Sequence, residues 1–184
     1  KGVMTLGLNA FSHCSLLASI DLPDGVISIG NAAFYNCESL RDVSVPASVV
    51  AIGQEAFEHT LWLDDQPDGV LYVNDVLYKY KGKMSPNTTI VIRKEVVSVT
   101  SKAFYGCDSL ASIVLPDGIT SINDECFSGC SSLQSIVMPK TVERIGSSAF
   151  FGCSSLDTLA LPDGIQLIGC RAFAGCNSLT TLFL

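Results

Sequence analysis

Cysteine is the residue type with the most capacity for chemistry in this 184-residue chain, which contains eight cysteines. Six of them occupy one column of an internal repeat: Cys14, Cys37, Cys107, Cys130, Cys153 and Cys176. This even spacing lacks the short paired spacing of zinc sites, so we expect no metal. We predict a column of inward thiols that behave as small apolar groups. A disulfide between neighbouring repeats is the alternative, because adjacent coils bring such cysteines within reach.

The remaining polar residues give little support for catalysis. Cys170 lies outside the column and is a candidate exposed thiol. His13 and His59 each follow a Phe by two residues, where other copies carry Gly or Asn, so a turn role is expected. Asp64, Asp65 and Asp68 lack the alternating spacing of a calcium loop, which favours a solvated loop. We predict no catalytic residues, no cofactor and no enzymatic activity.

A Phe column reveals the repeat that must position these side chains. Phe127 and Phe150 are 23 residues apart, and the full column is Phe11, Phe34, Phe57, Phe104, Phe127, Phe150 and Phe173. A fixed period of this length is typical of a solenoid, since one unit cannot bury its apolar face alone. We predict one domain over residues 1–184, with about eight coils. Both ends fall within the repeat, so we expect a fragment of a longer array.

Two strand-like segments are expected in each coil. The pattern Leu-x-x-Ile-x-Leu, as in 17–22 and 110–115, alternates inward and outward residues and predicts a parallel sheet with about 4.8 Å between coils. The second segment ends at a recurrent Gly, namely Gly7, Gly30, Gly53, Gly146 and Gly169. Asn123 takes this place in one copy, and Gly and Asn both adopt left-handed backbone, so we predict a left-handed corner at this position. Thr100 holds the same position in another copy and would be strained there.

The repeat loses its phase once. Phe57 and Phe104 are 47 residues apart, and residues 64–89 lack the repeat signature. Two β-rich runs there flank Asn74 and Asp75, a pair suited to a tight turn. We predict an inserted β-hairpin segment over 64–89, between N-terminal repeats (1–63) and C-terminal repeats (90–184).

The repeat unit resembles the bacterial surface-antigen (BspA-like, Treponema-type) leucine-rich repeat family. Its pattern, L-x-x-I-x-L-P-x-x-V-x-x-I-G-x-x-A-F-x-x-C-x-x-L, is matched almost residue for residue by 17–40. The resemblance implies a β-rich α/β fold, a right-handed solenoid with a parallel sheet. It also implies a bacterial cell-surface or extracellular protein, and it implies no catalytic site.

Composition excludes two classes of partner. The formal net charge is −7, which repels phosphate backbones, so nucleic acid is not expected. No apolar run approaches the roughly 20 residues that cross a bilayer, so we expect no direct membrane insertion by this segment. Apolar end coils favour end-to-end self-association of the isolated chain.

Two groups of surface residues are candidate ligand contacts. An outward column of the strand face becomes apolar over five copies, namely Val91, Val114, Val137, Ala160 and Phe183, beside Ser112, Ser135 and Thr158. Such a stripe favours a protein ligand, although β-branched residues also suit a pleated surface. The second group is aromatic: Trp62, Tyr72, Tyr78 and Tyr80. These rings could stack on a glycan, or they could attach the hairpin to the coil.

Three functions therefore remain open. The favoured one is adhesion to a protein ligand, such as a host matrix or cell-surface protein, through the strand face. A glycan-binding module that uses the aromatic residues is the first alternative. A passive structural spacer is the second.

Overall fold

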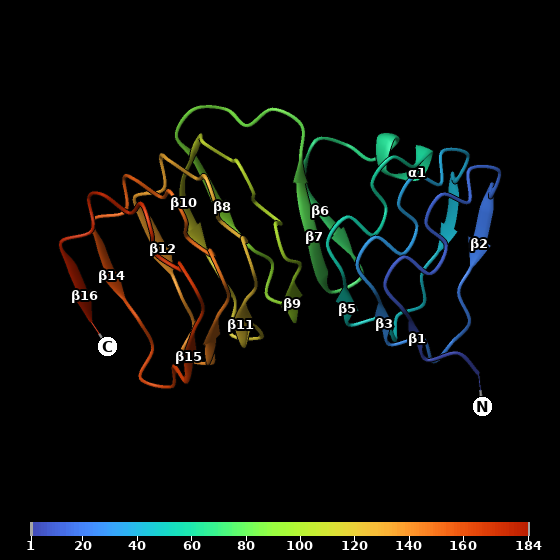
Figure 1. Cartoon of the computed structure of the whole chain (residues 1–184). Coiled ribbons are helices and arrows are strands. Elements are labelled where there is room, and N and C mark those ends of the chain that lie inside the picture. The colour runs from blue at the N-terminus through green and yellow to red at the C-terminus, as the bar shows by residue number, and fades with distance from the viewer. Residues whose placement is uncertain (1, 184) are drawn as a thin grey trace.

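The structure, a computed structural model, describes residues 2–183. It is a solenoid of about 8 turns of roughly 23 residues, and the coils follow one another from the N-terminal end to the opposite C-terminal end (Figure 1). The predicted β-rich leucine-rich-repeat solenoid is confirmed. Within the described residues the only helix is α1 (Leu61–Asp64).

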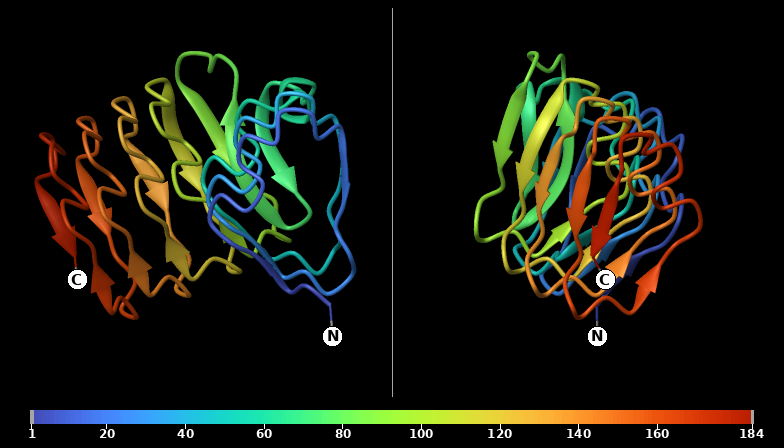
Figure 2. Two further views of the ribbon diagram at one scale, coloured as in Figure 1. Left: turned by 45° about the vertical axis from the view of Figure 1, so that its right-hand side comes forward. Right: turned by 90° about the vertical axis from the view of Figure 1, so that its left-hand side faces the viewer.

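Two ladders of short strands run along the solenoid. The first, which we call the short-strand ladder, contains β1 (Thr5–Leu6), β3 (Ser28–Ile29), β5 (Ala51–Ile52), β9 (Ser98–Val99), β11 (Ser121–Ile122), β13 (Arg144–Ile145) and β15 (Leu167–Ile168). The outer surface of the second is the strand face, formed by β2 (Ser19–Asp21), β4 (Asp42–Ser44), β8 (Thr88–Val91), β10 (Leu110–Val114), β12 (Ser135–Val137), β14 (Thr158–Ala160) and β16 (Thr181–Phe183). In the left view of Figure 2 the yellow-to-red coils of the C-terminal half stand in order along the stack.

Pairing in both ladders is parallel and joins equivalent repeat positions. Ser112 is opposite Ser135 in β10 and β12, and Thr158 is opposite Thr181 in β14 and β16. The strand face pairs in three separate groups, β2–β4, β8–β10–β12 and β14–β16. The parallel sheet expected from the repeat is therefore present, with interruptions.

A stack of Phe rings forms the centre of the core. Neighbouring rings lie 5.3 to 5.4 Å apart, nearly parallel, from Phe11 to Phe57 and again from Phe104 to Phe173. Phe34, Phe57, Phe104, Phe127 and Phe150 have no exposed surface. Each coil contributes one ring, so burial depends on the neighbouring coils, as a solenoid requires.

The cysteine column lies beside these rings. Cys37, Cys130 and Cys153 are buried, and all eight cysteines are free thiols. Each of these three thiols donates a hydrogen bond to the Phe carbonyl of the preceding coil, at 3.0 to 3.1 Å. The prediction of an inward thiol column is confirmed for these members, whereas Cys14 in the first coil is exposed. The alternative, disulfides between coils, is not what the structure shows.

The hairpin replaces most of one coil. Strands β6 (Gly69–Val73) and β7 (Val76–Lys81) pair antiparallel around a turn in which Asn74 has φ 52°. Strand β7 then joins the short-strand ladder, because Val76 and Leu77 pair in parallel with Ser98 and Val99. The chain leaves the coil path at Thr60, whose hydroxyl donates to the Phe57 carbonyl and accepts from the Leu63 N–H, so capping α1.

The prediction for the recurrent glycines is wrong. None of Gly7, Gly30, Gly53, Gly146 and Gly169 has a positive φ. Glycine is needed because coils approach closely: a Cβ on Gly30 would lie 2.6 Å from the carbonyl carbon of Gly7. Thr100 is not strained either, because its φ is not positive; its hydroxyl donates to the Ile52 carbonyl at 3.0 Å.

Left-handed backbone occurs further along each turn. Ala32 (φ 52°) and Glu55 (φ 58°) hold one such position, and Asn36 (φ 56°) holds another four residues beyond Ala32. His13 and His59 occupy this second position with φ of 63° and 59°, which confirms their predicted turn role.

Candidate binding surfaces

The apolar residues predicted to face outward on the C-terminal half of the strand face do so. Val91 is 70% exposed, Val137 56% and Phe183 58%. Ala160 is exposed and Val114 half-buried. We call these five residues the apolar stripe. The residues that precede Val91, Val114 and Ala160, namely Ile90, Ile113 and Leu159, point inward and are buried, because successive strand residues point to opposite sides. Ile136 is half-buried, and Leu182 in the last strand is 37% exposed.

A polar column lies beside the apolar stripe. Ser135 and Thr158 are exposed, and Ser112 is half-buried. The Ser112 hydroxyl donates to the Thr89 hydroxyl of the preceding coil at 3.0 Å. In the N-terminal half the position of the stripe is held by Asp21 and Ser44, both exposed. The strand face therefore changes from polar and acidic to apolar along the solenoid.

Trp62 lies at the edge of the polar half of the strand face. Its ring is half-buried against Phe57, with 4.6 Å between centroids. It lines a shallow hollow of about 510 Å³ together with Arg41, Asp42 and Ser44. The hollow therefore combines an aromatic ring with charged and hydroxyl groups.

The hairpin tyrosines mainly make internal contacts. Tyr78 is 1% exposed and sits edge-to-face against Phe57, 5.7 Å away between ring centroids. Burial raises the pKa of its hydroxyl above the usual range. Tyr80 packs near Phe104, and the Arg93 guanidinium lies 4.2 Å from the centroid of Tyr72.

The hypothesis that Tyr78 is a ligand contact needs correction, because the ring is enclosed. The hairpin replaces a coil that would have supplied a Phe. Tyr78 and Tyr80 fill the resulting gap between Phe57 and Phe104. Of the four predicted aromatic residues, Trp62 lines the hollow on the strand face, whereas Tyr78 and Tyr80 line a different cavity.

This second cavity, of about 450 Å³, was not predicted from the sequence. It opens between the turn at 53–60 and the turn at 100–107, where the hairpin-bearing coil supplies no turn of its own. We call it the interturn slot, and its walls and rim include Tyr35, Glu55, Glu58, His59, Lys102 and Tyr105. The 47-residue spacing from Phe57 to Phe104 was the available signal, since it leaves one A-F-x-x-C turn missing.

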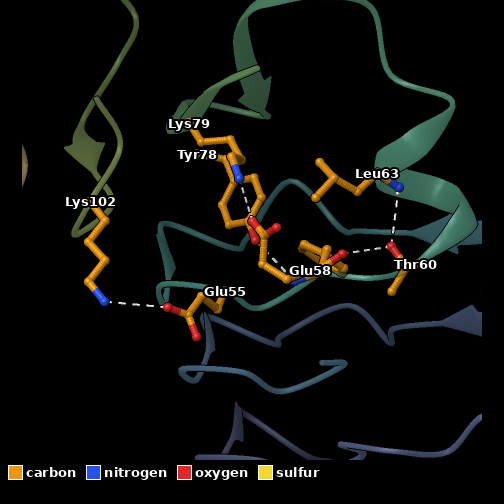
Figure 3. Close-up of polar contacts among 8 residues, drawn as sticks. Glu55, Glu58, Thr60, Leu63, Tyr78, Lys79 and Lys102 are labelled. Carbon is orange, nitrogen blue, oxygen red and sulfur yellow. Dashed lines mark hydrogen bonds and ion pairs between the residues drawn. The ribbon is translucent and has the colours of Figure 1, made fainter. Parts of the chain in front are cut away.

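Ion pairs cross the interturn slot. Lys79 on β7 lies 2.5 Å from Glu58, and Lys102 reaches 3.4 Å to Glu55, which holds the equivalent position in the earlier coil (Figure 3). Lys102 is also 4.0 Å from Glu125. Each lysine thus neutralises a carboxylate at the slot.

Residues 2–183 contain neither a metal-ligand group nor a membrane-spanning helix. They contain no group of three His, Cys, Asp or Glu side chains arranged to hold a metal ion. Over the same residues, every helix is too short or too polar to span a bilayer.

The stacked coils, the parallel ladders and the ring column define a leucine-rich-repeat solenoid. The family model for the BspA type leucine-rich repeat region matches six copies, over residues 1–65 and 77–184. The chain belongs to this family. The unmatched residues fall in the segment that holds β6 and the hairpin turn. No curated protein matches the chain.

Solved structures with similar folds come from bacteria. A leucine-rich cell surface protein of Faecalibacterium prausnitzii is 25% identical with a TM-score of 0.57, and the match covers 96% of this chain and 62% of that one. A leucine-rich repeat protein of Bacteroides ovatus is also 25% identical, with a TM-score of 0.51 and coverage of 97% and 51%.

The pneumococcal vaccine antigen PcpA has the same fold at 23% identity, with a TM-score of 0.61 and coverage of 98% and 53%. This chain thus spans about half to three fifths of the length of these structures.

Proposed function

We propose that this chain is a non-enzymatic binding module of a bacterial surface protein and that it recognises a protein ligand through the apolar stripe. The observation that carries the proposal is the exposure of Val91, Val137 and Phe183 on one strand face. Apolar groups that cluster on a surface stabilise a complex when a partner removes them from water. A surface location is supported by the Faecalibacterium relative, which is named a cell surface protein.

The chemistry of the strand face suits a protein partner. Exposed valine and phenylalanine side chains are flanked by Ser135 and Thr158, whose hydroxyls can donate and accept hydrogen bonds. An apolar centre with a polar rim is the usual anatomy of a protein interface. The short strands also hold these side chains on a regular, rigid lattice, which lowers the entropy lost on binding.

A screen against immobilised host matrix proteins and a polysaccharide panel tests the proposal. We expect binding to a protein, abolished by Val137→Asp combined with Val91→Asp and retained by Trp62→Ala. Protein binding that survives the double substitution contradicts the role of the stripe. Failure to bind any member of either panel favours a passive spacer.

A glycan ligand is the second candidate function, and the Trp62 hollow favours it. An indole face beside Asp42 and Ser44 provides a stacking surface with hydrogen-bonding groups for sugar hydroxyls. In the same screen this function predicts polysaccharide binding that Trp62→Ala removes and that the stripe substitutions leave intact. Tyr72→Phe is a control with no expected effect, because Tyr72 does not line this hollow.

A further inference from the structure

A backbone hydrogen-bond pattern connects neighbouring turns along the whole solenoid, and the interturn slot is the one place among residues 2–183 where it is interrupted. In the second coil the N–H groups of Ala32, Phe34 and Asn36 donate to carbonyls of the third coil at 2.8 to 3.0 Å. The same three bonds run from the Phe104 coil to the next, beginning with Lys102 to Asp124 at 3.0 Å. The turn at 53–60 has no following turn to receive its bonds.

The walls of the slot are the turn at 53–60 and the turn at 100–107. At each wall the hairpin replaces the middle one of the three missing bonds. The Phe57 N–H donates to the Tyr78 hydroxyl at 3.0 Å, and the Tyr80 N–H donates to the Ala103 carbonyl at 2.7 Å. Tyr78 and Tyr80 therefore form the floor of the interturn slot, and they satisfy its most buried backbone groups.

The outer bonds are not compensated. Within residues 2–183, the N–H groups of Glu55 and His59 have no acceptor, and the carbonyls of Ser101 and Tyr105 receive no donor. One wall of the slot thus offers two backbone donors and the opposite wall two backbone acceptors. Backbone groups in this arrangement are a template for another polypeptide.

From this pattern we propose that the interturn slot binds a short segment of a partner protein, whose backbone takes the place of the missing turn. The partner carbonyls accept from Glu55 and His59, and its N–H groups donate to Ser101 and Tyr105. The rings of Tyr35, His59 and Tyr105 on the rim contact its side chains.

Charge and hydrogen-bond chemistry favour a peptide over an anion. The carboxylates of Glu55 and Glu58 stand beside the free donors, and a phosphate or carboxylate ligand would meet them. A neutral peptide backbone has no charge for these carboxylates to repel, and it leaves their ion pairs with Lys102 and Lys79 in place. A peptide also supplies donors and acceptors in alternation, which matches both walls at once.

The test uses a phage-displayed library of random linear heptapeptides, selected on the whole chain. Affinity of the selected peptide is then measured for the native chain, Ser101→Trp and Ser147→Trp. Ser101 lines the slot, and Ser147 holds the equivalent position two coils later. We expect Ser101→Trp to weaken binding at least about tenfold and Ser147→Trp to leave it within about twofold, because only the first indole blocks the slot.

Amide hydrogen exchange provides a readout that does not depend on a variant. In the free protein, the Glu55 and His59 amides should exchange faster than the equivalent Ala32 and Asn36 amides, which are bonded. Bound peptide should protect Glu55 and His59. Stripe substitutions should leave peptide binding unchanged, which separates this site from the proposed function.

Three results would overturn the proposal. A selection that yields no binding peptide is one, and peptides that bind without protecting Glu55 and His59 are another. Binding of a polysaccharide at the slot, with no peptide selected, would assign a different ligand class.

Discussion

Tyr78 is the residue on which the junction between the two halves of the core depends. It is the largest fully buried side chain, and its hydroxyl accepts the Phe57 N–H at 3.0 Å. Tyr78→Phe removes that acceptor and leaves a buried donor unpaired, so we expect a loss of about 1–3 kcal/mol in unfolding free energy. Urea denaturation measures it, with Tyr105→Phe at an exposed site as the control, expected within about 0.5 kcal/mol. Equal effects of both substitutions would contradict the buried bond.

Because the thiols are buried, the contribution of the cysteine column to folding stability depends on pH in the alkaline range. Burial, together with the nearby Cys176, raises the pKa of Cys153 from 9.0 to about 12, and the hydrogen bond to a backbone carbonyl requires the protonated thiol. In the unfolded chain the thiol ionises near pH 9, so the folded state holds the proton more tightly above that pH. Its contribution to stability is fully present below pH 9 and falls as the pH rises from 9 towards 12.

The difference in unfolding free energy between native chain and Cys153→Ala measures this contribution. We expect it to shrink by about 1–2 kcal/mol between pH 8 and 10.5 under reducing conditions, since one pKa unit corresponds to about 1.4 kcal/mol. Cys170→Ala is the control, because Cys170 is exposed. If the difference in unfolding free energy between the native chain and Cys153→Ala does not change with pH, the Cys153 thiol is open to solvent and the prediction is wrong.

At the scale of elements, the spacing between coils explains the recurrent glycines. A Cβ on Gly30 would meet the backbone of Gly7 at 2.6 Å, whereas nothing lies within 4 Å of a Cβ on Gly7. Gly30→Ala should therefore destabilise the chain by about 1–3 kcal/mol through overpacking. Gly7→Ala should be neutral or slightly stabilising, because it restricts only the unfolded chain. Thermal melts compare the two, and equal changes would exclude close approach as the reason for glycine.

Elements set by local pattern could be predicted from the sequence. The Phe period determined the number of coils, alternation assigned the inward and outward strand residues, and Asn74-Asp75 located the hairpin turn. The role of Gly30 could not be predicted from the sequence, because Gly suits both a left-handed turn and a close contact. The distance between coils decides between these two roles. The direction of the Tyr78 ring also depends on which coil its strand joins.

The interturn slot could not be predicted for a similar reason. The phase break at 57–104 indicated an insertion, but an insertion is compatible with a complete coil beneath it. Only the pairing of β7 with β9 shows that the hairpin itself fills the coil and leaves out its turn. The apolar stripe, by contrast, follows directly from strand alternation and was predicted residue by residue.

At the scale of the whole molecule, the solenoid presents two distinct candidate binding surfaces, the strand face and the interturn slot. The strand face changes from acidic at β2 and β4 to apolar at β8 to β16. The interturn slot lies beside strand β7 of the hairpin, and the hairpin stands between the N-terminal and the C-terminal coils (Figure 1). Two separate surfaces on a rigid array allow one partner to be held at two points, which raises apparent affinity when both are engaged.

The most direct test of the account is the dissociation constant for the protein ligand found in the screen, measured with two matched double variants. Val91→Asp with Val137→Asp alters the apolar stripe. Val50→Asp with Val97→Asp alters two exposed valines, 51% and 43% exposed, that lie outside it. We predict that the first pair weakens binding at least about tenfold, as loss of central interface contacts does, and that the second changes it less than about twofold. Equal weakening by both pairs, or an effect of the second alone, would contradict recognition through the strand face.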